Sequence, residues 1–208
     1  KAMLERIRDR ALTLANEHGA HEIALRLTEA LRQHFPELPS AVQTLSQDAA
    51  KLKEILGSKQ LEAALGQLHR YVEALKPKAA LVAPVLVAHG FGPTAPGDAG
   101  MLFLLFSNAA RTLSGGEHAE LPWGIARDFA LHLHNEVDEY QACESVINGL
   151  LGAPALELPA RVAAQLTVDA TAVRRTILHK QMMSFTQAKA WGAAKATAER
   201  LIATTKDP

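Results

Sequence analysis

The sequence predicts an all-α protein made of stacked antiparallel helical hairpins. Apolar residues recur at intervals of three and four along most of the chain, which is the spacing of one helix face. Residues 8–17 are RDRALTLANE and residues 127–136 are RDFALHLHNE, so seven of ten positions agree at an offset of 119 residues (127 − 8). Repetition of this kind indicates a duplicated architecture.

The match extends beyond the two ten-residue segments. Downstream, the apolar positions Ala24, Leu27 and Leu31 align with Cys143, Val146 and Leu150, and Glu-Leu-Pro at 37–39 recurs at 157–159. We therefore predict two internally repeated four-helix blocks, residues 1–76 and 123–208. Residues 77–122 would join them through connecting helices and loops rich in glycine and proline.

The first block should contain four helices. We expect the first two at 3–18 and 21–34, with Gly19 between them because glycine tolerates the backbone conformation that often ends a helix. A third helix should begin near Ser40 and stop at Gly57-Ser58, and a fourth should cover 61–75. The residues expected to face inward in the second helix are Ile23, Ala24, Leu27, Ala30 and Leu31.

The connecting segment carries the most ambiguous pattern. Residues 79–88 are apolar and contain Pro84, so a short buried helix and a strand both fit, and the helical surroundings favour the helix. Residues 89–100 contain four glycines and two prolines and should form a loop. The helix expected at 101–113 begins MLFLLF, which predicts deep burial on all sides.

The second block should repeat the first. We expect a helix at 123–137, followed by one that Asp138 caps, with Gln141 completing an approximate capping box. Pro159 should open a long helix, and a final helix around 190–202 should end before Asp207-Pro208.

Composition limits the functional classes. Net charge is zero and the pI is near 7.3, which argues against general binding to nucleic acid or to an anionic membrane. The single cysteine, Cys143, excludes an intrachain disulfide and is consistent with a cytoplasmic location. No apolar run approaches the about 20 residues of a transmembrane helix. Because the chain begins with Lys1, the sequence leaves open whether a catalytic domain or J-domain lies outside it.

The paired helices resemble tetratricopeptide-type repeats. The segment AWGAAKATAERLIATTKDP is the best local match, an alanine-rich second helix followed by Asp-Pro, although the usual period near 34 is absent. The ALxLxNE segments are also similar to accessory helical regions beside J-domains in some bacterial co-chaperones. These resemblances imply a helical-hairpin fold that binds a protein or peptide.

The duplicated polar residues are the first candidates for function. Asn16-Glu17 and Asn135-Glu136 are either two equivalent binding positions or side chains that satisfy backbone groups at helix ends, and the structural role is favoured. The repeated Arg8-Asp9 and Arg127-Asp128 are expected to form inter-helix or surface ion pairs.

Nothing in the sequence points to catalysis or to a cofactor. The nine histidines lack the Glu-x-x-His and His-Glu-x-x-His spacings of common metal sites, so no metal is expected. The glycine loop has no Gly-Lys-Ser/Thr, and Ser107 and Ser184 lack the context of a nucleophile elbow. Cys143 aligns with Ala24, which predicts a small buried residue.

A basic stretch containing Arg174, Arg175 and Lys180 is the last candidate. A solvated helix face is the ordinary interpretation, and a groove for an acidic peptide is the functional one. We therefore expect a non-enzymatic protein- or peptide-interaction scaffold. The alternatives are a structural homo-oligomer subunit, or a ligand-binding or enzymatic protein with a pocket near MLFLLF and the glycine loop.

Overall fold

The computed structural model describes residues 2–153 and 156–206, and these residues form helices joined by turns, without a strand. The described chain divides into two compact units, 1–63 and 64–208. The boundary falls inside one helix, α3, so residues 64–75 belong to the second unit. The expected end at Asp207-Pro208 lies outside the described residues. None of the described helices is long and apolar enough to cross a membrane.

The first unit consists of α1 (Ala2–His18), α2 (His21–His34) and the first part of α3 (Pro39–Leu75). Gly19 has a φ of 65°, which explains why the chain turns there, as the sequence predicts. Small and apolar side chains fill two buried clusters between these helices. The clusters contain Ala11, Ala15, Ala24 and Leu52, and Leu4, Leu31 and Leu45.

Two predictions for the first unit are wrong. Helix α3 continues through Gly57 and Ser58, because a helical glycine costs only about 1 kcal/mol and ends a helix only where the backbone changes conformation. Gly57 keeps a negative φ. In α2, Ala24 and Leu31 are buried as predicted, but Ile23 is 54% exposed and Ala30 is exposed as well.

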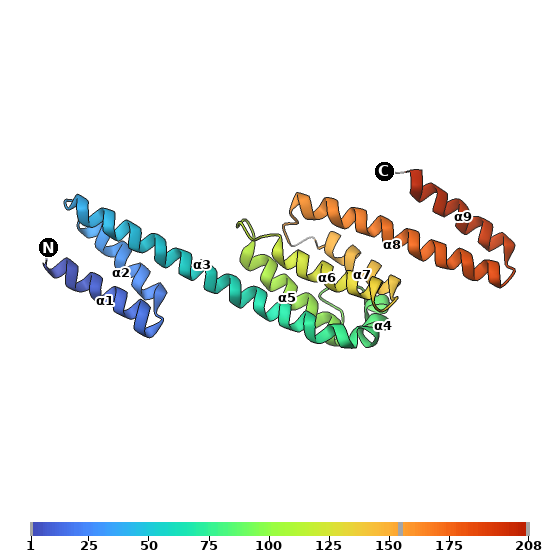
Figure 1. The fold of residues 1–208 in the computed structure, drawn as a ribbon, viewed down its shortest axis with the longest axis horizontal. Helices are drawn as coiled ribbons and strands as arrows, with labels where there is room; N and C mark the ends of the chain where they lie inside the picture. The colour runs from blue at the N-terminus through green and yellow to red at the C-terminus, as the bar shows by residue number, and fades with distance from the viewer. Residues whose placement is uncertain (1, 154–155, 207–208) are drawn as a thin grey trace. The chain divides into compact units, whose positions relative to one another are not determined.

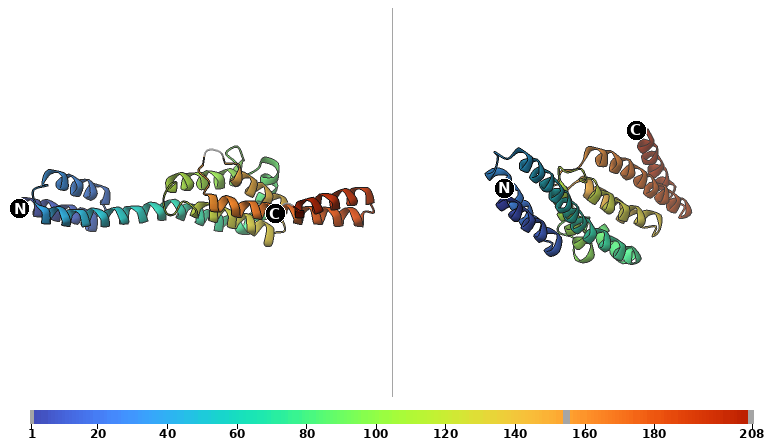
Figure 2. Two further views of the ribbon diagram at one scale, coloured as in Figure 1. Left: turned by 90° about the horizontal axis from the view of Figure 1, so that it is seen from above. Right: turned by 60° about the vertical axis from the view of Figure 1, so that its left-hand side comes forward.

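The second unit contains the end of α3, the 3-10 turn η1 (Lys76–Lys78) and the helices α4 to α9. The bounds are α4 (Ala79–His89), α5 (Gly97–Leu113), α6 (Leu121–Asn135), α7 (Tyr140–Leu151), α8 (Ala160–Gln187) and α9 (Trp191–Lys206). The ambiguous segment at 79–88 is therefore helical, with Pro84 inside α4. Helices α8 and α9 pack together as an antiparallel pair (Figure 1 and Figure 2).

An aromatic cluster forms much of the second unit's core. Phe91 lies in the loop after α4, and its ring contacts Phe103 and Phe106 of α5 with centroids 5.2 and 5.8 Å apart. Phe106 in turn contacts Trp123 of α6 edge-to-face at 4.9 Å. Because aromatic pairs prefer such edge-to-face and tilted geometries, these rings fix the 90–96 loop against α5.

Two predictions for the second unit are also wrong. The MLFLLF segment is buried on one side only: Leu102 and Phe106 are inaccessible, whereas Met101 is 45% and Leu104 is 50% exposed. Asp138 is not an N-cap, because its φ of 61° is far from the extended backbone of a capping residue. The N-cap of α7 is Glu139, and it makes no side-chain capping hydrogen bond.

Candidate functional site

A groove with two arginines is the best candidate for a binding site. Its cavity measures about 320 Å³ and lies among α4, α7, α8 and α9 of the second unit. We call it the arginine groove. It is lined by Val87, Gln141, Glu144, Ser145, Arg174, Ile177, Leu178, Gln181 and Arg200.

Charge in the arginine groove is only partly compensated. The Nε of Arg174 lies 3.9 Å from Oε1 of Glu144, which is an ion-pair distance but too long for a good hydrogen bond. Arg200 forms no ion pair within the described part of the chain. The groove therefore holds two guanidinium groups and one carboxylate, and it favours an anionic ligand group.

A second hollow of about 210 Å³ adjoins the arginine groove and shares Gln141, Ile177 and Gln181 with it. Here the Nζ of Lys180 lies 4.1 Å from the centroid of the Tyr140 ring and 3.7 Å from Oδ1 of Asp138. The Tyr140 hydroxyl donates a hydrogen bond to Asp138. This hydrogen bond, together with the charge of Lys180, lowers the pKa of Asp138 below its usual value.

The structure brings together only some of the candidate residues. Arg174 lines the arginine groove, and Lys180 lines the adjoining hollow. Asn135 is linked to that hollow through His134, whose Nδ1 lies 2.8 Å from Asn135 Oδ1 and whose ring contacts Tyr140 at 4.9 Å. Glu136 is exposed directly after the end of α6 and is not one of the residues that line the arginine groove or the adjoining hollow.

The other candidate residues lie elsewhere. Arg175 points to α9, where its Nη2 and Nε donate to the backbone carbonyl oxygen of Thr204 at 2.7 and 3.2 Å. Because that carbonyl lies near the end of α9, Arg175 holds this helix against α8. Asn16 and Glu17 are exposed near the end of α1 in the first unit.

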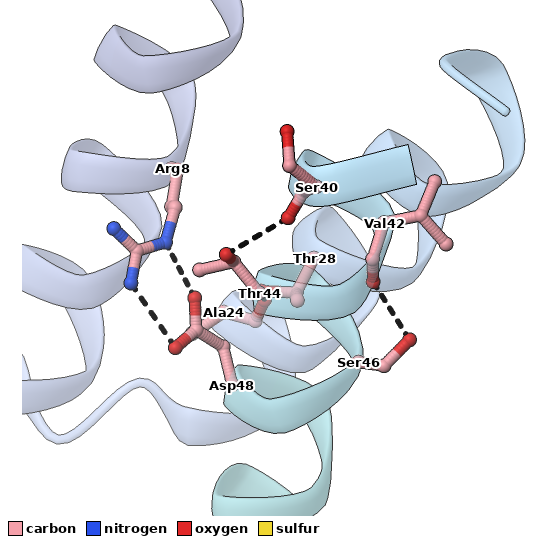
Figure 3. Close-up of polar contacts among 8 residues, drawn as sticks. All are labelled: Arg8, Ala24, Thr28, Ser40, Val42, Thr44, Ser46 and Asp48. Atoms are coloured by element: carbon pink, nitrogen blue, oxygen red, sulfur yellow. Dashed lines mark hydrogen bonds and ion pairs between the residues drawn. The ribbon is translucent and has the colours of Figure 1, made fainter. Parts of the chain in front are cut away.

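Each of the repeated arginines forms an inter-helix ion pair, as the sequence predicts. Its partner, however, is an aspartate distant in the sequence and not the aspartate that follows it directly. Arg8 of α1 donates from Nε and Nη2 to the carboxylate of Asp48 in α3, at 2.6 and 3.2 Å (Figure 3). The adjacent Asp9 is exposed. Such a bidentate pair fixes both the distance and the rotation of two helices.

Sequence reasoning missed Glu144, Gln181 and Arg200 as residues of the groove. Gln181 could have been found, because it follows Arg174 by seven residues on the same helix face. Arg200 could not have been found from the sequence, because it reaches the groove only through the packing of α9 on α8. Among the described residues, no three His, Cys, Asp or Glu side chains lie close enough together to hold a metal ion.

Comparisons with known proteins add no identification. No protein-family model, curated protein or solved structure matches this chain.

Proposed function

We propose that this chain is a non-enzymatic interaction module that binds an acidic segment of a protein or peptide partner in the arginine groove. The observation that carries this proposal is the pair Arg174 and Arg200 on one concave surface, with only Glu144 to compensate them. Arginine suits this role because its planar guanidinium binds a carboxylate through two hydrogen bonds.

Apolar surface beside the arginines supports a peptide over a simple anion. Val87 lines the same groove and is 45% exposed, and Ile177 lines both the groove and the adjoining hollow. A partner segment that alternates acidic and aliphatic side chains would match this lining, since peptide grooves combine apolar contacts with a few placed polar groups.

We also propose that α1–α2–α3 and α6–α7–α8 are copies of one helical unit, as in a tetratricopeptide-like scaffold. Two pairs of equivalent positions in the repeat have the same burial: Ala11 and Ala130 are both inaccessible, and so are Ala24 and Cys143. The arginine–aspartate pairs also use the same atoms in both copies. In this proposal, α7 and α8 of the second copy form part of the arginine groove, and α4 and α9, which lie outside the copy, complete it.

Fluorescence anisotropy tests the peptide proposal on the full chain. The probes are labelled peptides that alternate glutamate and leucine, and a matched set in which lysine replaces glutamate. We expect the acidic peptides to bind, and the variants Arg174→Glu and Arg200→Glu to weaken binding by at least about tenfold.

The control variant is Arg161→Glu. Arg161 has the same charge, its side chain is 88% exposed, and it does not line the groove. Arg175 should be left intact, because it holds α9. If Arg161→Glu weakens binding as much as Arg174→Glu, the attraction is general electrostatics, and the groove is not the site.

A structural oligomer subunit is the second candidate. Around the turn between α8 and α9, Met183 is 46%, Phe185 is 36% and Trp191 is 64% exposed. Exposed apolar side chains near this turn favour self-association. Light scattering coupled to size-exclusion chromatography would show a dimer or larger species that Trp191→Glu converts to a monomer, and a monomeric native chain would contradict this candidate.

A further inference from the structure

Another groove lies along α5 and shares no lining residue with the arginine groove. Its cavity measures about 380 Å³, within the range of about 300–1,000 Å³ typical of small-molecule sites. We call it the α5 groove. It is lined by Pro93, Ala95, Gly97, Gly100, Met101, Phe103, Leu104, Ser107 and Arg111.

The loop wall of the α5 groove is held rigidly in place. At Gly100, an added Cβ would lie 2.0 Å from the carbonyl oxygen of Ala95, so the loop backbone packs directly on the helix. At Gly149 of α7, an added Cβ would lie 2.3 Å from the carbonyl oxygen of Phe91. Two glycines thus allow the 90–96 loop to approach both helices, and the groove exists without a ligand.

The α5 groove is apolar at one end and polar at the other. Met101, Phe103 and Leu104 form the apolar end. Ser107 lies three residues after Leu104, and Arg111 lies four residues after Ser107, which places them along the same face of α5. A ligand lying along this face would therefore meet hydrocarbon first and then a hydroxyl and a guanidinium.

Ser107 gives the independent sign that the groove takes a ligand. Its side chain is 2% exposed, and its Oγ has no hydrogen-bond partner in the described part of the chain. Buried hydroxyl groups are nearly always paired, so an unpaired one that lines a cavity indicates a partner that the protein itself does not provide. A carboxylate oxygen is such an acceptor.

Arg111 supplies the charge. It is exposed, one helical turn beyond Ser107, and forms no ion pair within residues 2–153 and 156–206. We propose that the α5 groove binds a small monocarboxylic acid with an apolar body, such as a medium-chain fatty acid. The hydrocarbon lies against Met101 and Leu104, and the carboxylate accepts hydrogen bonds from Arg111 and Ser107.

Calorimetry and amide NMR spectra of the full chain test this proposal with octanoate. The comparison probes are octanamide, which keeps the chain but removes the charge, and propionate, which keeps the charge but shortens the chain. We expect octanoate to shift the amide resonances of Gly97 and Gly100, and both comparison probes to bind at least about tenfold more weakly.

Variants assign the contacts. Arg111→Gln should weaken octanoate binding by at least about tenfold, and Ser107→Ala, which leaves the helix intact, should weaken it several-fold. Arg161→Gln is the matched control and should leave the affinity unchanged. Circular dichroism identifies any variant that fails to fold, and the other variant then decides.

Three outcomes would overturn the proposal. The first is that millimolar octanoate leaves Gly97 and Gly100 unshifted. The second is that octanamide binds as well as octanoate, which would show that the carboxylate is not recognised. The third is that a short peptide with a free C-terminal leucine binds more tightly than octanoate, which would make the groove a peptide site. None of these results bears on the arginine groove, whose test uses other residues.

Discussion

Arg127 of α6 donates hydrogen bonds from Nε and Nη2 to the two carboxylate oxygens of Asp169 in α8, at 2.5 and 3.1 Å. Asp169 also accepts a hydrogen bond from the side-chain amide of Gln165 at 3.2 Å. The carboxylate and its hydrogen bond raise the pKa of Arg127 above its already high usual value. Arg127 and Asp169 therefore remain paired, and they fix α6 against α8.

Breaking this pair should destabilise the second unit. The side chains of Arg127 and Asp169 are 27% and 10% exposed, so removing the arginine leaves a carboxylate largely shielded from water. We expect Arg127→Met to lower the free energy of unfolding by about 1.5–3 kcal/mol, the range for a hydrogen bond to a charged group. Urea denaturation of the full chain measures this loss.

A double-mutant cycle separates the pair from the individual side chains. Arg127→Met combined with Asp169→Leu should recover part of the loss, because no unpaired charge then remains. Arg8→Met provides the comparison in the first unit. Its pair is slightly more exposed, at 31% and 14%, so its loss should be smaller. Additive losses in the cycle would show that the pair contributes nothing.

Two glycines in the second unit should respond to alanine in opposite ways. At Gly149 the new Cβ would lie 2.3 Å from the Phe91 carbonyl oxygen, so the 90–96 loop must shift. We expect Gly149→Ala to cost about 1–3 kcal/mol, as overpacking usually does. Gly124 in α6 has no atom within 4 Å of an added Cβ, and Gly124→Ala should stabilise by about 0.5–1 kcal/mol. Thermal unfolding followed by circular dichroism measures both, and equal effects would mean that the loop does not pack on α7.

The continuity of α3 can be tested at Gly57. An added Cβ there meets no atom within 4 Å, and its φ is negative. If the helix continues, Gly57→Ala should raise the free energy of unfolding by about 0.5–1 kcal/mol, and Gly57→Pro should lower it by about 3 kcal/mol. A chain that really turns at 57–58 would tolerate proline and gain little from alanine.

Local pattern was enough to predict the helices, whereas their ends required backbone geometry. The periodicity of apolar residues correctly placed α2, and the helical surroundings, not the periodicity, correctly favoured a helix around Pro84. It failed at Gly57, where glycine remains helical, and at Asp138, where a residue typical of an N-cap adopts a positive φ instead. Residue type alone does not distinguish these states.

Sites formed by several helices were harder to predict than helices. The sequence identified Arg127 as one half of an ion pair, but its partner Asp169 lies 42 residues away and becomes a neighbour only when α8 packs on α6. Arg200 enters the arginine groove in the same way. The burial of α5 also depends on which helices cover it. The apolar run MLFLLF predicts that Leu104 is buried, but that side of α5 is exposed in the fold.

Burial should make Cys143 unreactive in the folded chain. Its side chain is inaccessible, and burial, followed by the charges of Asp169 and Glu144, raises the pKa of its thiol to about 12. Only the thiolate is nucleophilic, and a pKa raised by about three units lowers the thiolate fraction at pH 8 by about a thousandfold. We expect iodoacetamide to alkylate Cys143 only after urea unfolds the chain, as mass spectrometry would show.

The same shift predicts a loss of stability at alkaline pH. The folded state keeps the thiol protonated while the unfolded chain ionises near its usual pKa of 9.0, so the contribution is complete below pH 9 and lost as the pH rises toward about 12. Tyr71 acts in the same direction, because burial and its hydrogen bond to Asp98 raise its pKa to about 12. Between pH 8 and pH 11, the free energy of unfolding measured in urea should therefore fall less steeply with pH for Cys143→Ala than for the native chain. Identical slopes, or rapid alkylation of the folded protein, would show that Cys143 is accessible to solvent.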